Sequence, residues 1–220
     1  EEMQQLLEHT QETAALLAID SPSGFTREAA EHVMQRFGAL GYACELTRKD
    51  GVIIDLGGKN KEDAILLEVH MDTLGGMVAQ IKGDGRLKLT SLGGMNPNNA
   101  EAENVRVHTR DGKVIEGTCQ LCNASVHVNG DYSSSKRSWD TTEVVLDEDV
   151  NSAADTRALG IEVGDIVAFE PRTRVTASGY IKSRFLDDKL SVAILLGLAK
   201  YIKDESITLP RRTYVHITVY

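Results

Sequence analysis

A short apolar run that ends abruptly in polar residues constrains the fold of this chain more than any other stretch. Residues 64–69 read Ala-Ile-Leu-Leu-Glu-Val, and His70-Met71-Asp72 follows directly. Such a run is typical of a strand that crosses a buried sheet and emerges at its carboxyl edge, where open α/β sheets bind ligands. Because strand residues two apart share a face, we expect His70 and Asp72 to lie side by side, with Met71 turned away.

An imidazole and a carboxylate aimed at one spot can form part of a metal site. A metal-bound histidine usually donates its other ring N–H to a carboxylate or a backbone carbonyl. Asp72 would then orient His70 as a metal ligand. The plainer interpretation is an exposed histidine near a strand end, followed by an aspartate that begins a turn, and an isolated His-x-Asp leaves both open.

Composition narrows the class of protein. The chain has 220 residues, of which 41% are hydrophobic, as in a globular protein of one large or two small domains. A net charge of −9 argues against a nucleic-acid or anionic membrane partner and leaves small or peptide ligands. Three cysteines favour a reducing compartment, and no apolar run reaches the length of about 18 residues that predicts a membrane span. We therefore expect a cytoplasmic protein.

The order of the patterns predicts a layered α/β domain. Apolar residues at helical spacing predict one helix from about residue 2 to 19, and another from the N-cap Thr26 to Gly41. Residues 42–47 and 52–56 alternate as a strand pair across an Asp-Gly turn, and the strand that ends at His70 follows.

The pattern changes after Asp72. Short alternating strands separated by Gly-rich turns predict a small, barrel-like β domain over residues 73–174, inserted into an α/β domain made of residues 1–72 and 175–220. Within the insert, the polar segment 129–142 predicts a long mobile loop. The strands expected there are 77–81, 87–90, 105–109, 114–118, 144–146 and 166–169.

Two further groups of residues have chemical content. Asp187-Asp188 precedes an apolar helix at 190–202; the pair either complements the helix dipole or supplies a carboxylate that bridges two cations. Cys119-x-x-Cys122 with His127 offers three of the four ligands of a zinc site. Because no fourth Cys or His stands at finger-like spacing, two reduced cysteines on a strand are favoured.

Together these pieces resemble the glutamyl or deblocking aminopeptidases of the tetrahedral aminopeptidase type, di-metal exopeptidases of which some members are labelled endoglucanases. The matching pieces follow the family's order over nearly the whole chain. They are Pro22-Ser23-Gly24, Val69-His70-Met71-Asp72 with Leu74-Gly75-Gly76-Met77-Val78, Leu92-Gly93-Gly94, Gly160-Ile161 with Gly164-Asp165, Val167 and Phe169, and Lys182-Ser183 with Leu186-Asp187-Asp188.

The resemblance implies a role for each residue of the site. His70 is a ligand of one metal, Asp72 is the catalytic residue that orients it, Asp187 bridges both metals, and Asp188 is structural. Two divalent ions are implied, and mixed imidazole and carboxylate ligands suit zinc or cobalt, with manganese as a third option. The resemblance also implies a zinc-peptidase-like α/β domain, and an inserted domain through which subunits dimerise and assemble into a dodecamer.

The sequence departs from the family's pattern in three places. Lys189 stands where the family usually has Arg, and residues 129–142 have no clear counterpart. The family's Glu-Glu pair, which supplies a general base and a metal ligand, would follow directly after Tyr220, with a further Asp and His later. We therefore expect a chain truncated on its C-terminal side and inactive alone.

The favoured function is a metal-dependent aminopeptidase that removes amino-terminal residues from peptides through a water activated by two metals. A deacylase of N-acyl amino acids is an alternative with the same architecture. The alternative from another class is a noncatalytic assembly or peptide-binding protein without a complete metal centre.

Overall fold

The chain forms two compact units in a computed structural model that describes residues 2–220, with side chains described from Thr10 onward. One unit comprises Glu1–Thr73 and Pro171–Tyr220, and the other comprises Leu74–Glu170; we call them the α/β unit and the barrel unit. The side chains of Leu6 and Leu7, which contribute to the first predicted helix, lie outside the described residues. No described helix has an apolar stretch long enough to cross a membrane.

A mixed four-stranded sheet forms the centre of the α/β unit. Its strand order is β1 (Ala43–Leu46), β2 (Val52–Gly57), β12 (Arg211–Thr218) and β3 (Asn60–His70). β12 runs antiparallel to β2 and parallel to β3, with Thr218 opposite His70. The last strand of the chain therefore lies between the second and third strands, and the carboxyl ends of β3 and β12 meet at one edge of the sheet.

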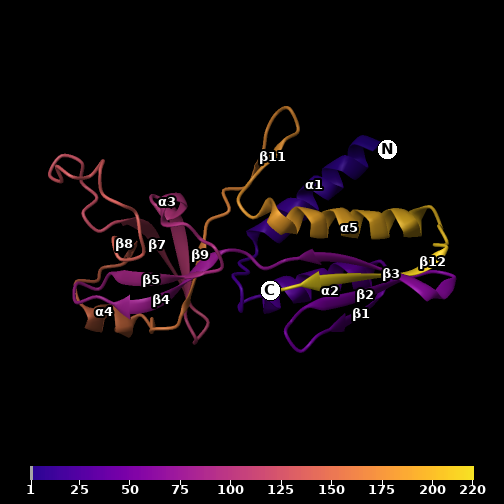
Figure 1. Ribbon diagram of the computed structural model, residues 1–220, viewed down its shortest axis with the longest axis horizontal. Coiled ribbons are helices and arrows are strands. Elements are labelled where there is room, and N and C mark those ends of the chain that lie inside the picture. The colour runs from indigo at the N-terminus through magenta and orange to yellow at the C-terminus, as the bar shows by residue number, and fades with distance from the viewer. Residues whose placement is uncertain (1) are drawn as a thin grey trace. The chain divides into compact units, whose positions relative to one another are not determined.

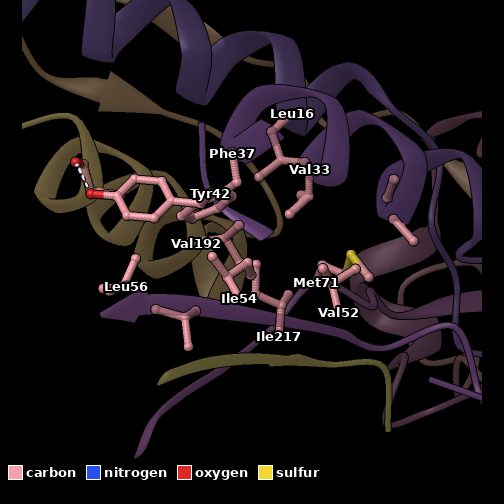
Figure 2. Close-up of a cluster of buried hydrophobic side chains, with 14 of the residues drawn as sticks. Leu16, Val33, Phe37, Tyr42, Val52, Ile54, Leu56, Met71, Val192 and Ile217 are labelled. Carbon is pink, nitrogen blue, oxygen red and sulfur yellow. Dashed lines mark hydrogen bonds between the residues drawn. The ribbon is translucent and has the colours of Figure 1, made fainter. Parts of the chain in front are cut away.

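Three helices pack on one face of this sheet: α1 (Glu2–Ala18), α2 (Arg27–Ala39) and α5 (Leu186–Asp204). Figure 1 shows α1 and α5 lying over the same side of the strands. Figure 2 shows Phe37 of α2 and Val192 of α5 packed against Ile54 and Ile217 of the sheet, and all four are buried. Residues alternate between buried and half-buried along β2 and β12 because only every second side chain reaches these helices.

The two ends of α2 differ in how well the sequence predicted the residues that begin and end the helix. Gly41 follows the helix with φ +82°, a conformation that favours glycine. Thr26 occupies the N-cap position as predicted, but its side chain makes no capping hydrogen bond. Its backbone, at φ −116° and ψ 2°, lies outside the β region from which an N-cap side chain reaches the first turn.

β3 differs from its prediction in burial. The apolar run predicts a strand in the interior of a sheet, but among the described strands β3 pairs only with β12. Ile65 is 38% exposed and Leu66 is 56% exposed. An apolar run predicts a strand from its composition, but it carries no information on how many neighbours the strand has.

The barrel unit confirms the expectation of a small β-barrel. Its six strands close in the order β4-β5-β8-β7-β6-β9. Their bounds are β4 (Gly75–Ile81), β5 (Leu87–Leu92), β6 (Asn104–His108), β7 (Val114–Leu121), β8 (Thr142–Leu146) and β9 (Ile166–Phe169). Alternate residues such as Val107, Val144 and Val167 are fully buried. Short helices α3 (Pro97–Ala100) and α4 (Ala153–Ala158) lie between strands, and the sequence pattern did not predict α3.

The predicted loop 129–142 is a series of turns that Arg137 connects to Glu101 through hydrogen bonds. The Arg137 guanidinium donates to both carboxylate oxygens of Glu101, at 2.7 and 3.1 Å, and to the backbone carbonyls of Tyr132 and Ser135 at 2.8 Å. These hydrogen bonds from Arg137 lower the pKa of Glu101. Local polarity predicted a loop correctly, but it could not show an ion pair with a residue 36 positions away.

The cysteines of the barrel unit are free and differ in exposure. Cys119 is fully buried on β7, whereas Cys122 is exposed. Burial raises the pKa of the Cys119 thiol to about 12. Because zinc binds the thiolate, this environment disfavours Cys119 as a ligand.

The chain returns from the barrel unit to α5 through a short hairpin, β10 (Arg174–Val175) and β11 (Ile181–Lys182). The hairpin is closed by a hydrogen bond from the Thr176 N–H to the Tyr180 carbonyl, at 2.9 Å. In Figure 1 it leads directly to the start of α5. Asp187 and Asp188 are the second and third residues of that helix.

Candidate metal centre

β3 carries His70 to the carboxyl edge of the sheet. Met71 is fully buried, whereas the His70 side chain is 39% exposed, so the two point in different directions as strand alternation predicts. The Nδ1 atom of His70 lies 3.1 Å from the Asp72 Oδ1 atom and 3.2 Å from the Asp72 carbonyl oxygen. With Nδ1 protonated, both oxygens can accept its N–H, which leaves the Nε2 lone pair free for a cation.

The Nε2 atom of His70 faces Asp187, which is 117 positions later in the chain. The distance from Nε2 to the Asp187 Oδ1 atom is 3.1 Å, and the Asp187 side chain is 95% exposed. The next residue, Asp188, accepts a hydrogen bond from the backbone N–H of His70 at 3.2 Å. Both aspartates have non-helical backbone angles, so regular helix begins only after them. A cis peptide bond joins the two residues.

The segment after α1 holds the end of β3 in place. The Ser21 hydroxyl donates to the Met71 carbonyl at 2.8 Å, and the Ser23 hydroxyl donates to the Asp72 Oδ2 atom at 2.5 Å. Backbone hydrogen bonds connect Thr73 to Ser21 and Ser23 at 2.8 and 3.2 Å. Sequence reasoning gave these serines no role. Ser23 stands in one of the motifs that carry the family resemblance, and the polar Ser-Pro-Ser-Gly break between two helices equally predicts an ordinary turn.

The electrostatics of this site favour a positive charge. Partial burial lowers the pKa of His70, but the charge of Asp72, the hydrogen bonds to Asp187 and to the Asp72 carbonyl, and the charge of Asp188 together raise it. Three carboxylates thus converge on one imidazole. A site that stabilises the imidazolium also suits a metal cation, for which the proton is a competitor.

The donor pair fits a divalent metal in chemistry and in spacing. Two ligands at about 2.1 Å from one tetrahedral ion lie about 3.4 Å apart, close to the 3.1 Å between His70 Nε2 and Asp187 Oδ1. His70 and Asp187 are the residues that would hold the ion, and Asp72 would orient the ring. Among the described residues, no group of three or more His, Cys, Asp or Glu side chains could hold an ion by itself. The described chain therefore offers an imidazole and an exposed carboxylate, which could form part of a ligand set.

The family follows from comparison with known proteins. The model described as M42 glutamyl aminopeptidase matches residues 50–220. The chain belongs to this family. The resemblance drawn from the sequence motifs is thereby confirmed, while the roles of His70, Asp72 and Asp187 stay predictions.

Relatives in sequence and structure are longer than this chain. A Bacillus subtilis (strain 168) protein named "Putative aminopeptidase YhfE" is 41% identical over 203 residues, which are 92% of this chain and 59% of the relative. The structure of aminopeptidase APDkam598 from the archaeon Desulfurococcus kamchatkensis matches with a TM-score of 0.83 at 21% identity, covering 98% of this chain and 56% of that one. The Pyrococcus horikoshii TET1 peptidase matches with a TM-score of 0.79 at 21% identity, covering 97% and 61%. The two structural matches show the fold.

Proposed function

We propose that this chain is part of a metal-dependent aminopeptidase and supplies His70, Asp72 and Asp187 to its metal centre. The observation that carries the proposal is the His70 ring held between two carboxylates, Asp72 at Nδ1 and Asp187 at Nε2, at the carboxyl edge of a sheet. Membership of the M42 family supports the reaction class. The chain spans 59% of the length of its Bacillus relative, so the aminopeptidase activity of the whole protein is proposed here and is not shown by the similarity.

Each residue has a distinct part in this centre. His70 would hold one ion through Nε2, and the exposed Asp187 carboxylate would be shared between that ion and a second one. Asp72 accepts the Nδ1 proton, which fixes the ring's tautomer and orientation. Zinc, cobalt and manganese all suit these donors, and a pair of such ions, when bound, supplies an activated water and a polarised carbonyl.

The substrates in this proposal are peptides with a free amino terminus, and the location is the cytoplasm. All three cysteines are free thiols, as expected in a reducing compartment. The proposal includes assembly of identical subunits through the barrel unit. In support, the Pyrococcus horikoshii TET1 peptidase is described as able to assemble into a tetrahedron or a large octahedral shell.

Cobalt titration of the chain tests the metal centre. We expect weak but saturable Co²⁺ binding that is lost in His70→Ala and in Asp187→Asn. Asp204→Asn is the matched control, because Asp204 lies on the same helix and pairs with Lys200 at 2.6 Å, outside the site. Binding that is unchanged in both site variants would contradict the proposal.

A chimera in which the C-terminal part of the Bacillus relative follows Tyr220 tests the reaction. We expect it to hydrolyse leucyl and glutamyl anilides and to leave N-acetyl-leucine intact. The reverse preference would identify a deacylase. A chimera that binds metal but cleaves neither substrate would favour the noncatalytic alternative.

A further inference from the structure

The lysine that follows the Asp187-Asp188 pair is completely buried. Lys189 has 0% exposure, and its ammonium donates to the carbonyls of Leu16 at 3.0 Å and Ile19 at 2.6 Å. These two carbonyls lie at the carboxyl end of α1 and just beyond it. The side chain therefore connects the start of α5 to the end of α1.

Burying an ammonium is costly even when it is hydrogen-bonded, and an apolar side chain of the same length would fill this space at lower cost. The position of Lys189 indicates what the charge contributes. It is the first residue with helical backbone after Asp188, so fastening Lys189 also fixes the backbone from which Asp187 projects. At 95% exposure the Asp187 carboxylate is not held by packing, so its direction depends on this backbone.

The acceptors of Lys189 belong to the segment that also holds His70. Two residues after Ile19, Ser21 bonds the Met71 carbonyl, and Ser23 bonds Asp72, which in turn contacts the His70 ring. Residues 19–23 thus contact both halves of the site. Lys189 fastens the half that carries Asp187, and the two serines fasten the half that carries His70.

We propose that Lys189 is a positioning residue that holds the Asp187 carboxylate against the His70 ring through its hydrogen bonds to the end of α1. This proposal rests on the proposed function for the role of His70 and Asp187 as metal ligands. The contact between the two side chains is present in the metal-free chain. The plainer role is that Lys189 only satisfies carbonyls at the end of α1. Both roles predict a loss of stability on substitution, and only positioning predicts that Asp187 leaves His70.

Lys189→Met and Lys189→Arg separate the two roles. Methionine fills the buried space with a flexible side chain of similar length but cannot donate, whereas arginine keeps the donors and the charge. Tyr42→Phe is the matched control, because it removes a buried hydrogen bond to the Ala199 carbonyl, also on α5 but three turns from Asp187. Asp187→Asn is the reference for a lost contact.

The first readout is the ¹⁵N spectrum of the His70 ring in the metal-free full chain, at one pH. We expect Lys189→Met to shift the Nε2 resonance as Asp187→Asn does, and Lys189→Arg and Tyr42→Phe to keep the wild-type position. A wild-type spectrum in Lys189→Met would overturn the proposal and leave the simple capping role. If Asp187→Asn itself caused no shift, the His70–Asp187 contact would be absent in solution, and this proposal and the proposed function would both fail.

The second readout is Co²⁺ affinity. Residues that orient metal ligands typically contribute 10–100-fold in affinity, and we expect a loss of about tenfold or more in Lys189→Met with rescue in Lys189→Arg. An equal loss in Tyr42→Phe would show that destabilisation alone explains the effect and would overturn positioning. Absence of Co²⁺ binding in the wild-type chain would count against the proposed function, while the ring spectrum would still decide the role of Lys189.

Discussion

At the scale of single residues, three aspartates share one histidine without competing for the same atom. Asp72 contacts Nδ1, Asp187 contacts Nε2, and Asp188 accepts from the backbone N–H. Of these, only Asp187 is almost fully exposed, so its carboxylate is accessible from solvent. The site is therefore asymmetric: Asp72 and Asp188 fix the histidine, and Asp187 faces outward.

Replacing Asp72 by Asn tests the orienting role. The amide keeps the size of the side chain but not its charge, so the ring loses its strongest acceptor, and we expect Co²⁺ affinity to fall about 10–100-fold. Asp84→Asn serves as the control, because Asp84 is a half-exposed carboxylate of the barrel unit. Calorimetric titration at one pH measures both variants. Equal affinity in wild type and Asp72→Asn would show that the carbonyl of residue 72 suffices.

The buried thiol of Cys119 makes the stability of the barrel unit depend on pH. The fold raises the thiol pKa from 9.0 to about 12. Between these values the unfolded chain has lost the proton that the folded chain keeps. The free energy of unfolding should therefore fall as pH rises from 9, by at most about 1.4 kcal/mol per pH unit.

The measurement is urea unfolding at pH 8 to 10.5, followed by the fluorescence of Trp139, the only tryptophan, which lies in the barrel unit. Cys119→Ala is the control, because it has no thiol to ionise. The difference in unfolding free energy between wild type and this variant should be constant below pH 8.5 and change above it. A difference that stays constant to pH 10.5 would contradict the raised pKa.

At the scale of helices and strands, the sequence predicted local structure better than arrangement. The apolar helix behind Asp187-Asp188 and the strand before His70 were both predicted from an apolar run bounded by polar residues. The position of β12 between β2 and β3, by contrast, depends on pairings across more than 140 residues. Lys189 illustrates the same limit. The sequence marked it only as a departure from Arg, and its acceptors at the end of α1 and just beyond it lie 173 and 170 positions away.

Two glycines at the turn between β2 and β3 allow a test of how closely this turn packs against the start of β12. A Cβ atom on Gly58 would lie 2.0 Å from the Arg211 carbonyl oxygen, at the start of β12, and φ at Gly58 is +128°. Gly57 also has a positive φ, +85°, but its Cβ would meet nothing within 4 Å. Gly57→Ala should lose about 1–2 kcal/mol from backbone strain, and Gly58→Ala a further 1–3 kcal/mol or so from the clash.

Amide hydrogen exchange of β12 measures this difference, because the clash acts directly on that strand. We expect faster exchange in β12 for Gly58→Ala than for Gly57→Ala. Equal exchange in the two variants would show that the turn can move away from Arg211 without disturbing the sheet.

At the scale of the whole molecule, the described chain combines a complete barrel with a sheet whose functional edge carries two candidate ligands. A catalytic zinc normally has three protein ligands, and a two-metal centre needs more. The described residues offer His70 and Asp187, and no larger group that could hold an ion. Both residues could be singled out from the sequence because each stands at the end of an element with a clear pattern, and the structure brings them within 3.1 Å of each other. Their roles as metal ligands come from the family resemblance and stay predictions.

We predict that residues 1–220 alone do not hydrolyse peptides. Each cation would lack ligands, and no carboxylate of the site is free to act as general base. Asp72 is engaged by His70 and Ser23, Asp188 accepts from the backbone N–H of His70, and Asp187 is assigned to bridging. General-base assistance typically contributes 10²–10⁴-fold, so leucyl-anilide turnover should be at least about 100-fold below that of the chimera with the Bacillus relative. Bound zinc and cobalt are measured alongside turnover at equal protein concentration. Stoichiometric, tight metal binding with comparable turnover in the 220-residue chain would show that its own residues complete the centre, and the roles assigned to Asp72 and Asp187 would then be wrong.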